Sequence, residues 1–261
     1  CCSLSIGSLH DALYQSAEHP VMRLVVRDVA WRLDVLRQIC QALFYMHHVD
    51  FLHRDIKPLN VLLFADSALR HGAVVKLADF GFARGVDNQS VGVVQPKGTP
   101  HYMAPEALVA RYSKATDVYA LGVLMNEVLA EAAPYQDQEQ AKAWNFVQLT
   151  NAVVGGGSRP TLFSREQTSP AREMLQLSES SAECAGLVAS LERLVMQAWS
   201  PQPEDRGSVE HLHLQLNRLF EMYQHVCRYG CRHADPNPNP SSSAKVAQTP
   251  PVPSPPQDAK N

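Results

Sequence analysis

Residues 53–60 read His53-Arg54-Asp55-Ile56-Lys57-Pro58-Leu59-Asn60. This stretch places a carboxylate, two cations and a carboxamide on one short segment. A second motif, Asp79-Phe80-Gly81, begins 19 residues after the asparagine. A positioned carboxylate suits proton transfer, and carboxylate and carboxamide oxygens are the ligands that hard cations such as Mg²⁺ prefer. The two motifs together predict one site that moves a proton and holds a divalent cation.

The composition is that of an ordinary globular protein. The chain has 261 residues, 45% of them hydrophobic and 19% charged, which allows one large or two modest domains. A formal charge of −3 gives no basic footprint for nucleic acid, and no apolar run approaches the roughly 18 residues of a membrane span. The cysteines show no regular spacing and no secretory signal is present, which favours a cytoplasmic location. The first residue is Cys1, not Met, which suggests a chain that begins inside a longer protein or has been processed.

Apolar periodicity predicts several helices and one β-hairpin. A turn at Gly7 should lead into a short helix capped by Ser8. Longer helices are expected over 31–47, 116–128, 187–198 and 209–223, the last after a Ser208 cap. Strands 61–64 and 74–78 should form a hairpin with Asn60 at one end and Asp79 at the other, so that these two residues become neighbours.

These motifs resemble those of the eukaryotic protein kinases. Residues 53–60 match the catalytic loop H-R-D-x-K-x-x-N, Asp79-Phe80-Gly81 matches the magnesium motif, and 98–106 end in the Ala-Pro-Glu signature of an activation segment. The segment from Trp199 to Arg206 resembles the family's Trp-x-x-x-Pro-x-x-Arg turn, and the 31–47 helix resembles that of the tyrosine-kinase-like group. The resemblance implies a mainly α, kinase-like C-lobe bundle with a short β-hairpin carrying the catalytic loop and the Asp-Phe-Gly motif.

The resemblance also implies a division of the chain. Residues 1–227 would form the C-lobe, with the activation segment at 79–106 and a surface insertion at about 164–181. Residues 228–261 are rich in Pro and Ser and should be a disordered tail. Its segment Pro250 to Pro256 is either an inert tail or a polyproline helix that docks on a polyproline-binding domain.

Resemblance assigns the reaction to a few side chains. Asp55 would accept the proton of the substrate hydroxyl, Lys57 would face the transferring phosphate, and Thr99 would bridge the two. Asn60 and Asp79 would hold Mg²⁺ and thereby ATP. Lys57 together with Gly98-Thr99 resembles the serine/threonine pattern, so the acceptor would be a serine or threonine hydroxyl of a protein substrate.

Other residues would shape the site rather than react. Leu62 would lie on the floor of the adenine pocket, while His53 and Phe80 would join an apolar stack; ordinary core packing is the alternative for all three. Asp117 begins the buried central helix, and Glu106 with Arg206 resembles a buried ion pair. Turn chemistry is the alternative for Asp55, Asn60 and Asp79, since Asp and Asn favour loops.

Regulation would involve Arg54, which in this family pairs with a phosphate on the activation segment. Ser90 is the only hydroxyl in the central part of that segment and is the expected phosphosite.

A four-residue cluster, His225, Cys227, Cys231 and His233, has ligand types that bind Zn²⁺. Its spacing is tighter than in ordinary zinc fingers. A helix end with free thiols is the alternative.

A whole protein kinase also has a glycine-rich loop, a strand lysine and a helix glutamate ahead of this region. Neither G-x-G-x-x-G nor V-A-I-K occurs in this sequence. Two functions therefore remain open: a serine/threonine kinase of which this chain is a fragment, weakly active or inactive alone, and a kinase-like interaction module without activity.

Overall fold

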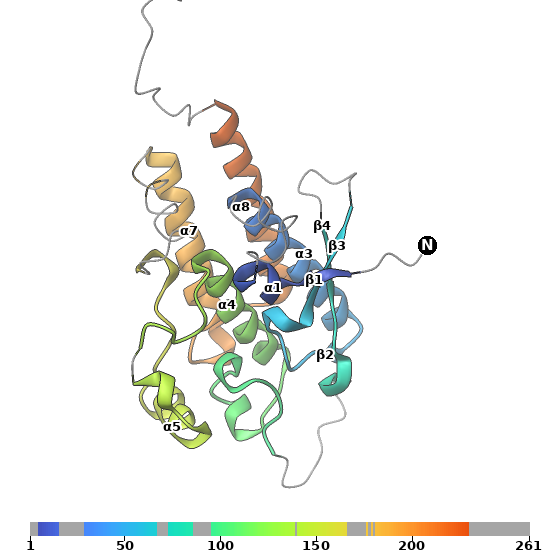
Figure 1. Ribbon diagram of the computed structural model, residues 1–261, viewed down its shortest axis with the longest axis vertical. Helices are drawn as coiled ribbons and strands as arrows, with labels where there is room; N and C mark the ends of the chain where they lie inside the picture. Colours follow the sequence, from blue (N-terminus) through green and yellow to red (C-terminus); the bar gives the residue numbers. More distant parts are fainter. Residues whose placement is uncertain are drawn as a thin grey trace, which may run out of the picture. The chain divides into compact units, whose positions relative to one another are not determined.

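The computed structural model describes residues 5–15, 29–66, 73–85, 95–138, 140–165, 176, 179 and 181–229 (Figure 1). Contacts divide the chain into two units, Cys1–Cys231 and Arg232–Asn261, and every described residue belongs to the first. The expected phosphosite Ser90 and the segment Pro250 to Pro256 lie outside the described residues. So do most of the expected insertion and, in the cysteine–histidine cluster, everything but the His225 side chain and the helical backbone of Cys227.

Four long helices form the core of the first unit. They are α3 (Val29–His48), α4 (Lys114–Ala130), α7 (Ala182–Ala198) and α8 (Val209–Tyr229). Helix α3 packs against α4 and α8, and α7 packs against α4 and α8 (Figure 1). The mainly α character that the resemblance implied is confirmed.

Helix α4 is the centre of this bundle. Every residue from Thr116 to Ala130 is buried, so the helix is covered by protein around its whole circumference instead of along one stripe. A capping box formed by Ser113 and Thr116 begins the helix, and Glu131 ends it in a left-handed conformation with φ 48°. Because α4 is surrounded by protein, side chains along it can contact several other segments, among them the catalytic stretch at its first turn.

A three-stranded antiparallel sheet lies beside α3 in the order β1-β3-β4 (Figure 1). Its strands are β1 (Ser5–Ser8), β3 (Val61–Ala65) and β4 (Ala73–Leu77), and β3 pairs with β4 from Val61 opposite Leu77 to Ala65 opposite Ala73. The turn expected at Gly7 is wrong, because Gly7 and Ser8 lie in strand β1 opposite Leu63 and Leu62. Local Gly and Ser signals indicate a turn, whereas pairing with a distant strand holds this segment extended.

Gln38 of α3 fixes the position of the hairpin. Its Oε1 accepts a hydrogen bond from the Val75 backbone N–H at 2.9 Å, and its Nε2 donates to the Ala73 carbonyl at 3.3 Å. The glutamine thereby occupies the edge of β4 as a neighbouring strand would. This contact ties the ends of the hairpin to the helix that precedes the catalytic stretch.

The other elements are short. A two-stranded sheet pairs β2 (Phe51–Leu52) with β5 (Arg84–Gly85). The short helices are α1 (Leu9–Tyr14), α5 (Phe146–Thr150) and a π-helical turn, Asn151–Gly155; single 3₁₀ turns are Pro58–Asn60, Phe80–Phe82, Pro100–Tyr102, Ala107–Val109, Ala141–Ala143, Phe163–Arg165 and Pro203–Asp205.

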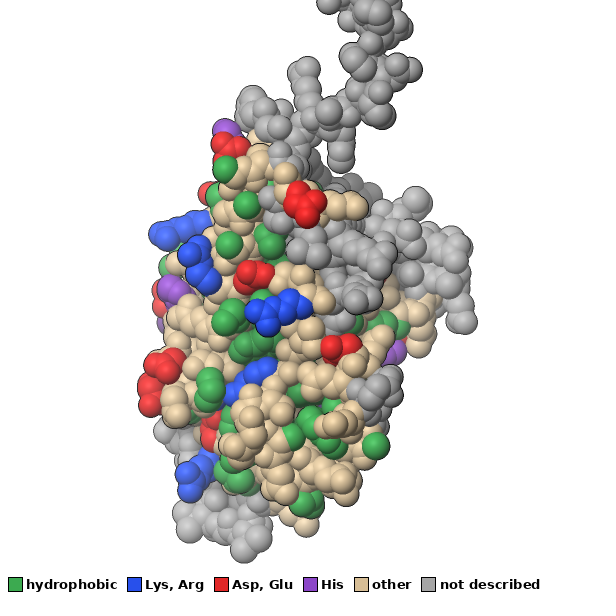
Figure 2. All heavy atoms as spheres, turned by 90° about the vertical axis from the view of Figure 1, so that its left-hand side faces the viewer, with side chains coloured by type: hydrophobic (Ala, Val, Ile, Leu, Met, Phe, Trp, Pro, Cys, Tyr) green, Lys and Arg blue, Asp and Glu red, His purple; other side chains and the backbone are tan. Residues whose placement is uncertain are grey.

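The described part of the chain contains no helix long and apolar enough to cross a membrane. On the face drawn in Figure 2, Lys and Arg side chains are separated by acidic and uncharged groups instead of forming one patch.

Candidate active site

The catalytic stretch is anchored to the start of α4 by one carboxylate. Asp117 accepts hydrogen bonds from the backbone N–H groups of His53 and Arg54, both at 2.8 Å, and its Oδ2 lies 2.9 Å from His47 Nε2. The Asp117 side chain is 1% exposed and stands in the first turn of the helix, where the helix dipole favours negative charge. Arg54 adopts φ 66°, a strained conformation that these hydrogen bonds hold in place.

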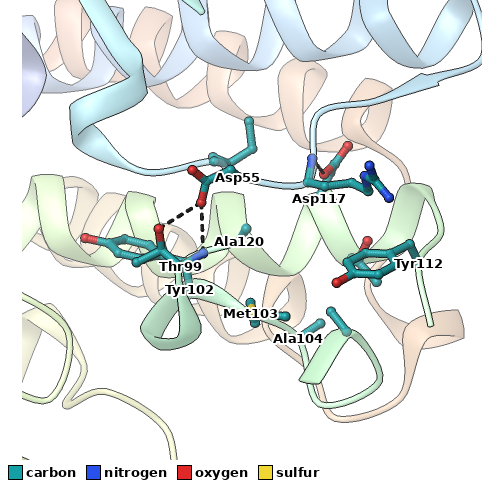
Figure 3. Close-up of a pocket in the computed structure, with 12 residues that line it drawn as sticks. Asp55, Thr99, Tyr102, Met103, Ala104, Tyr112, Asp117 and Ala120 are labelled. Carbon is teal, nitrogen blue, oxygen red and sulfur yellow. Dashed lines mark hydrogen bonds between the residues drawn. The ribbon is translucent and has the colours of Figure 1, made fainter. Parts of the chain in front are cut away.

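Asp55, Lys57 and Thr99 form a closed hydrogen-bonded cluster. Asp55 Oδ1 accepts from the Thr99 hydroxyl at 2.8 Å and from the Thr99 backbone N–H at 2.9 Å, as Figure 3 shows. Lys57 Nζ lies 2.8 Å from Asp55 Oδ2 and donates to Thr99 Oγ1, also at 2.8 Å. The structure thus brings together three residues that lie up to 44 positions apart.

Asp55 is ionised in this setting. The carboxylate residue is 4% exposed, and burial by itself raises the pKa. Hydrogen bonds from Lys57, Thr99 and Asn60 outweigh burial, so that the pKa of Asp55 lies below its ordinary value. An ionised carboxylate can accept a proton at neutral pH.

Asn60 and Asp79 lie at the same end of the β3–β4 hairpin. The Ala78 backbone N–H donates to the Asn60 carbonyl at 2.9 Å, which places Asp79 next to the strand that follows Asn60. Asn60 Nδ2 donates to the Asp55 carbonyl at 2.8 Å and to Asp55 Oδ2 at 2.9 Å, so its Oδ1 is the atom left to face a cation. Asp79 is exposed and adopts φ 60°. Two oxygen donors at an open edge fit Mg²⁺ shared with phosphate oxygens.

The three residues assigned to apolar packing differ in burial. His53 is fully buried, its Nε2 lies 3.1 Å from the Ala78 carbonyl, and burial lowers the pKa of its imidazole. Phe80 packs on His53 with ring centroids 5.6 Å apart but is 55% exposed. Leu62 is partly exposed in β3, between Ser8 of β1 and Lys76 of β4. Phe80 therefore presents an exposed apolar ring directly after Asp79 in the chain.

Gly98 lets the activation segment approach the catalytic loop. Its φ is +123°, and a Cβ there would lie 2.7 Å from the Arg54 carbonyl oxygen. Only glycine fits this close backbone approach without a shift of the segment. The next residue, Thr99, thereby reaches Asp55.

The Arg54 side chain contacts two groups of the described chain. Its Nε donates to the Phe82 carbonyl, and its guanidinium lies 5.1 Å from the centre of the Tyr112 ring.

Glu106 and Arg206 form the buried ion pair expected from the sequence motifs. Arg206 is fully buried and binds both carboxylate oxygens of Glu106, at 2.5 and 2.9 Å, across 100 residues. It also donates to the carbonyls of Ala115, Ser200 and Pro201. The pair joins the end of the activation segment to the start of α4 and the loop before α8.

Sequence reasoning missed a second buried carboxylate, Glu127. It accepts hydrogen bonds from the hydroxyls of Tyr14 and Tyr102, both at 2.7 Å, and is 2% exposed. Burial raises the pKa of Glu127 to about 7, against the opposing effect of the two hydroxyls. The sequence did indicate such a group, because a glutamate inside the apolar run 118–130 would be buried and must find hydrogen-bond partners. Tyr112 was also missed, since a loop tyrosine has no comparable signal.

No group of three or more His, Cys, Asp or Glu side chains within the described ranges could hold a metal ion. The zinc cluster suggested for 225–233 stays untested, because most of it lies outside those ranges.

Comparison with known proteins agrees with the motifs. The family model "Protein kinase domain" matches residues 9–215. Human receptor-interacting serine/threonine-protein kinase 3 is 33% identical over 197 residues, which are 73% of this chain and 33% of that protein. Serine/threonine-protein kinase TIO of Arabidopsis thaliana is 40% identical over 102 residues, which are 39% of this chain and 7% of that protein. The protein "Putative serine/threonine-protein kinase B" of Trypanosoma brucei brucei is 40% identical over 131 residues, which are 49% of this chain and 28% of that protein. The chain thus spans a third or less of the length of these relatives. A family match over most of the chain shows that it belongs to the protein kinase domain family.

Proposed function

We propose that this site transfers the γ-phosphoryl group of ATP to a serine or threonine hydroxyl of a protein. The observation that carries the proposal is the position of Thr99, whose hydroxyl bridges Asp55 Oδ1 and Lys57 Nζ, each at 2.8 Å. Three groups with complementary charge and hydrogen-bonding capacity converge on one point from two distant segments. The serine/threonine kinases among the relatives support this acceptor class.

Asp55 is the proposed base. The acceptor oxygen forms its bond to the γ-phosphorus while the bond from that phosphorus to the departing ADP oxygen breaks, and Asp55 takes the hydroxyl proton. Both Asp55 oxygens already accept hydrogen bonds from Thr99, Lys57 and Asn60, which fixes the orientation of the carboxylate. Lys57 stands on the same side as the proposed phosphate and would stabilise its negative charge.

Asn60 and Asp79 are the proposed ligands of Mg²⁺. A bound Mg²⁺ would neutralise charge on the phosphate oxygens and orient them. Leu62, partly exposed on β3, would contact the adenine ring. Regulation through Arg54 and Ser90, docking of Pro250 to Pro256 on a polyproline-binding domain, and membership of the tyrosine-kinase-like group remain proposals from the sequence motifs.

Two forms of this proposal differ in what the chain does alone. In the first, the chain is part of a longer kinase, and a phosphate-covering loop that residues 1–261 do not encode completes the site. In the second, the chain is a kinase-like interaction module. The ordered contacts of Asp55, Asn60 and Thr99 favour the first, because a binding module has no need for an oriented base.

Nucleotide binding separates the two forms. Titration with MgATP should raise the melting temperature of the chain, since a ligand that binds only the folded state stabilises it. Asp79→Asn removes a carboxylate oxygen from the proposed metal site and should abolish most of the MgATP-dependent shift. Asp205→Asn, at an exposed turn, is the matched control and should keep the wild-type shift.

Two results would contradict parts of this proposal. One is the absence of any shift with wild-type protein at millimolar MgATP, which would favour the interaction module. The other is an equal shift in Asp79→Asn and Asp205→Asn, which would remove Asp79 from the metal site.

A further inference from the structure

Tyr112 contacts both segments that form the phosphoacceptor site. Its ring covers the guanidinium of Arg54 at 5.1 Å. Its hydroxyl accepts a hydrogen bond from the Lys97 backbone N–H at 2.5 Å and lies 3.0 Å from the Lys97 carbonyl, to which it donates. Tyr112 itself stands in the loop between the Ala-Pro-Glu motif and α4, and Figure 3 shows it on the far side of Met103 and Ala104 from Thr99. One side chain therefore joins the catalytic loop to the activation segment.

The two partners of Tyr112 flank the reacting groups directly. Arg54 precedes Asp55, and Lys97 lies two residues before Thr99. Between Lys97 and Thr99 stands Gly98, whose Cα packs so closely on the Arg54 carbonyl that a Cβ would lie 2.7 Å from that oxygen. A displacement of Lys97 must therefore move either this tight contact or the Thr99 hydrogen bonds to Asp55.

The Arg54 side chain is held on several sides within the protein. Its Nε donates to the Phe82 carbonyl, its backbone N–H donates to Asp117, and its charged plane faces the Tyr112 ring. A guanidinium over an aromatic face is stabilised by the ring quadrupole, the more so when both are partly desolvated. Tyr112 thus connects this held arginine to the backbone of Lys97 in the activation segment.

We propose that Tyr112 is a positioning residue that sets the distance between Thr99 and Asp55 by holding Lys97 against Arg54. This inference rests on the proposed function, because it specifies how the acceptor site is kept in register. The hydroxyl holds the Lys97 backbone, and the ring holds the Arg54 cation. The two parts of the side chain can therefore be removed separately.

Hydrogen exchange of the Lys97 amide tests the contact with the Tyr112 hydroxyl and needs no enzymatic activity. In Tyr112→Phe the Lys97 N–H loses its acceptor, and its exchange rate should rise about tenfold, as expected for one lost hydrogen bond at a local opening. Tyr45→Phe, at a tyrosine that is 68% exposed on α3, is the matched control and should leave Lys97 unchanged. The Val75 amide, bonded to Gln38, serves as an internal reference that should exchange at the same rate in all three proteins, which shows that the fold is intact.

Kinetics with a serine peptide and a second variant extend the test to function. Tyr112→Phe should raise KM for the peptide several-fold with KM for ATP unchanged, and Tyr112→Leu, which also removes the ring from Arg54, should raise peptide KM further. Equal changes in both KM values would contradict a positioning role.

The two proposals fail in different ways. Unchanged exchange at Lys97 in Tyr112→Phe would overturn the role of Tyr112, whatever the activity. Faster exchange at Lys97 in Tyr112→Phe, together with no binding of MgATP by the wild-type chain, would overturn the proposed function while the Tyr112 contact stands.

Discussion

The two parts of helix α4 hold buried carboxylates in opposite surroundings. Near the start of the helix, Asp117 accepts two backbone N–H groups and lies against His47. Ten residues further on, Glu127 accepts hydrogen bonds from two tyrosine hydroxyls of the described chain, and burial raises its pKa to about 7. Asp117 holds the catalytic loop, whereas Glu127 joins α1 to the turn that carries Tyr102.

This difference shows that one helix can hold two parts of a site through carboxylates whose charge is stabilised to different degrees. Backbone donors and a helix N-terminus stabilise the charge on Asp117 directly. Glu127 has neutral donors alone among its hydrogen-bond partners, so its charge is opposed by burial. We therefore expect the contact between Glu127 and the activation segment to respond to pH near neutrality.

Removal of Asp117 should have the largest effect. Asp117→Ala leaves the N–H groups of His53 and Arg54 and the ring of His47 without their acceptor, at a cost of about 3 to 5 kcal/mol in the free energy of unfolding. Urea denaturation at pH 7 measures this. Asp50→Ala, at an exposed aspartate paired with Lys114, is the control and should change stability far less. Similar losses in both variants would show that Asp117 is not the anchor.

Glu127 should produce a smaller effect that appears only with pH. Its pKa is raised from 4.5 to about 7, so between these values the folded protein keeps a proton that the unfolded chain loses. The free energy of unfolding should therefore fall as pH rises from about 4.5 to about 7, by up to about 3 kcal/mol, and should then stay level. Urea denaturation of wild type and Glu127→Gln across this range should show the decline in wild type alone.

The control for this pH profile is Glu221→Gln, at an exposed glutamate of α8, which should keep the wild-type decline. A decline of the same size in Glu127→Gln would mean that other groups cause it.

Loss of one tyrosine hydroxyl should have the smallest effect. Tyr14→Phe removes the hydrogen bond to Glu127 Oε1, which should cost about 1 kcal/mol in unfolding free energy at pH 8. It should also raise the pKa of Glu127 further, because that hydroxyl lowers it, and so move the decline to higher pH. The exposed Tyr45→Phe should change neither quantity, and a pH profile unaltered in Tyr14→Phe would separate Tyr14 from Glu127.

Much of the fold could be predicted from local patterns. The helices expected over 31–47, 116–128, 187–198 and 209–223 each exist, with ends extended by up to six residues. The turn expected at Gly7 was wrong and helix α5 was not expected, since a strand that pairs with a distant partner and a five-residue helix leave little periodic signal.

Some residues of the candidate site could likewise be predicted from the sequence, and others could not. Asp55, Lys57, Asn60 and Thr99 could be named because their motifs resemble those of protein kinases, and the structure brings them within hydrogen-bonding distance. Tyr112 could not be named in this way. Its partners are the backbone of Lys97 and the guanidinium of Arg54, and no sequence motif indicates either contact.

Contiguous residues are enough to predict the protein kinase family and the helical core, because family motifs and apolar periodicity are local properties of the chain. Which carboxylate has a pKa near neutrality, how far Phe80 is exposed and what Arg54 contacts follow from the folded arrangement alone. Those properties depend on burial and on partners tens of residues away. Desolvation and hydrogen bonding act through space, so they arise only when the chain is folded.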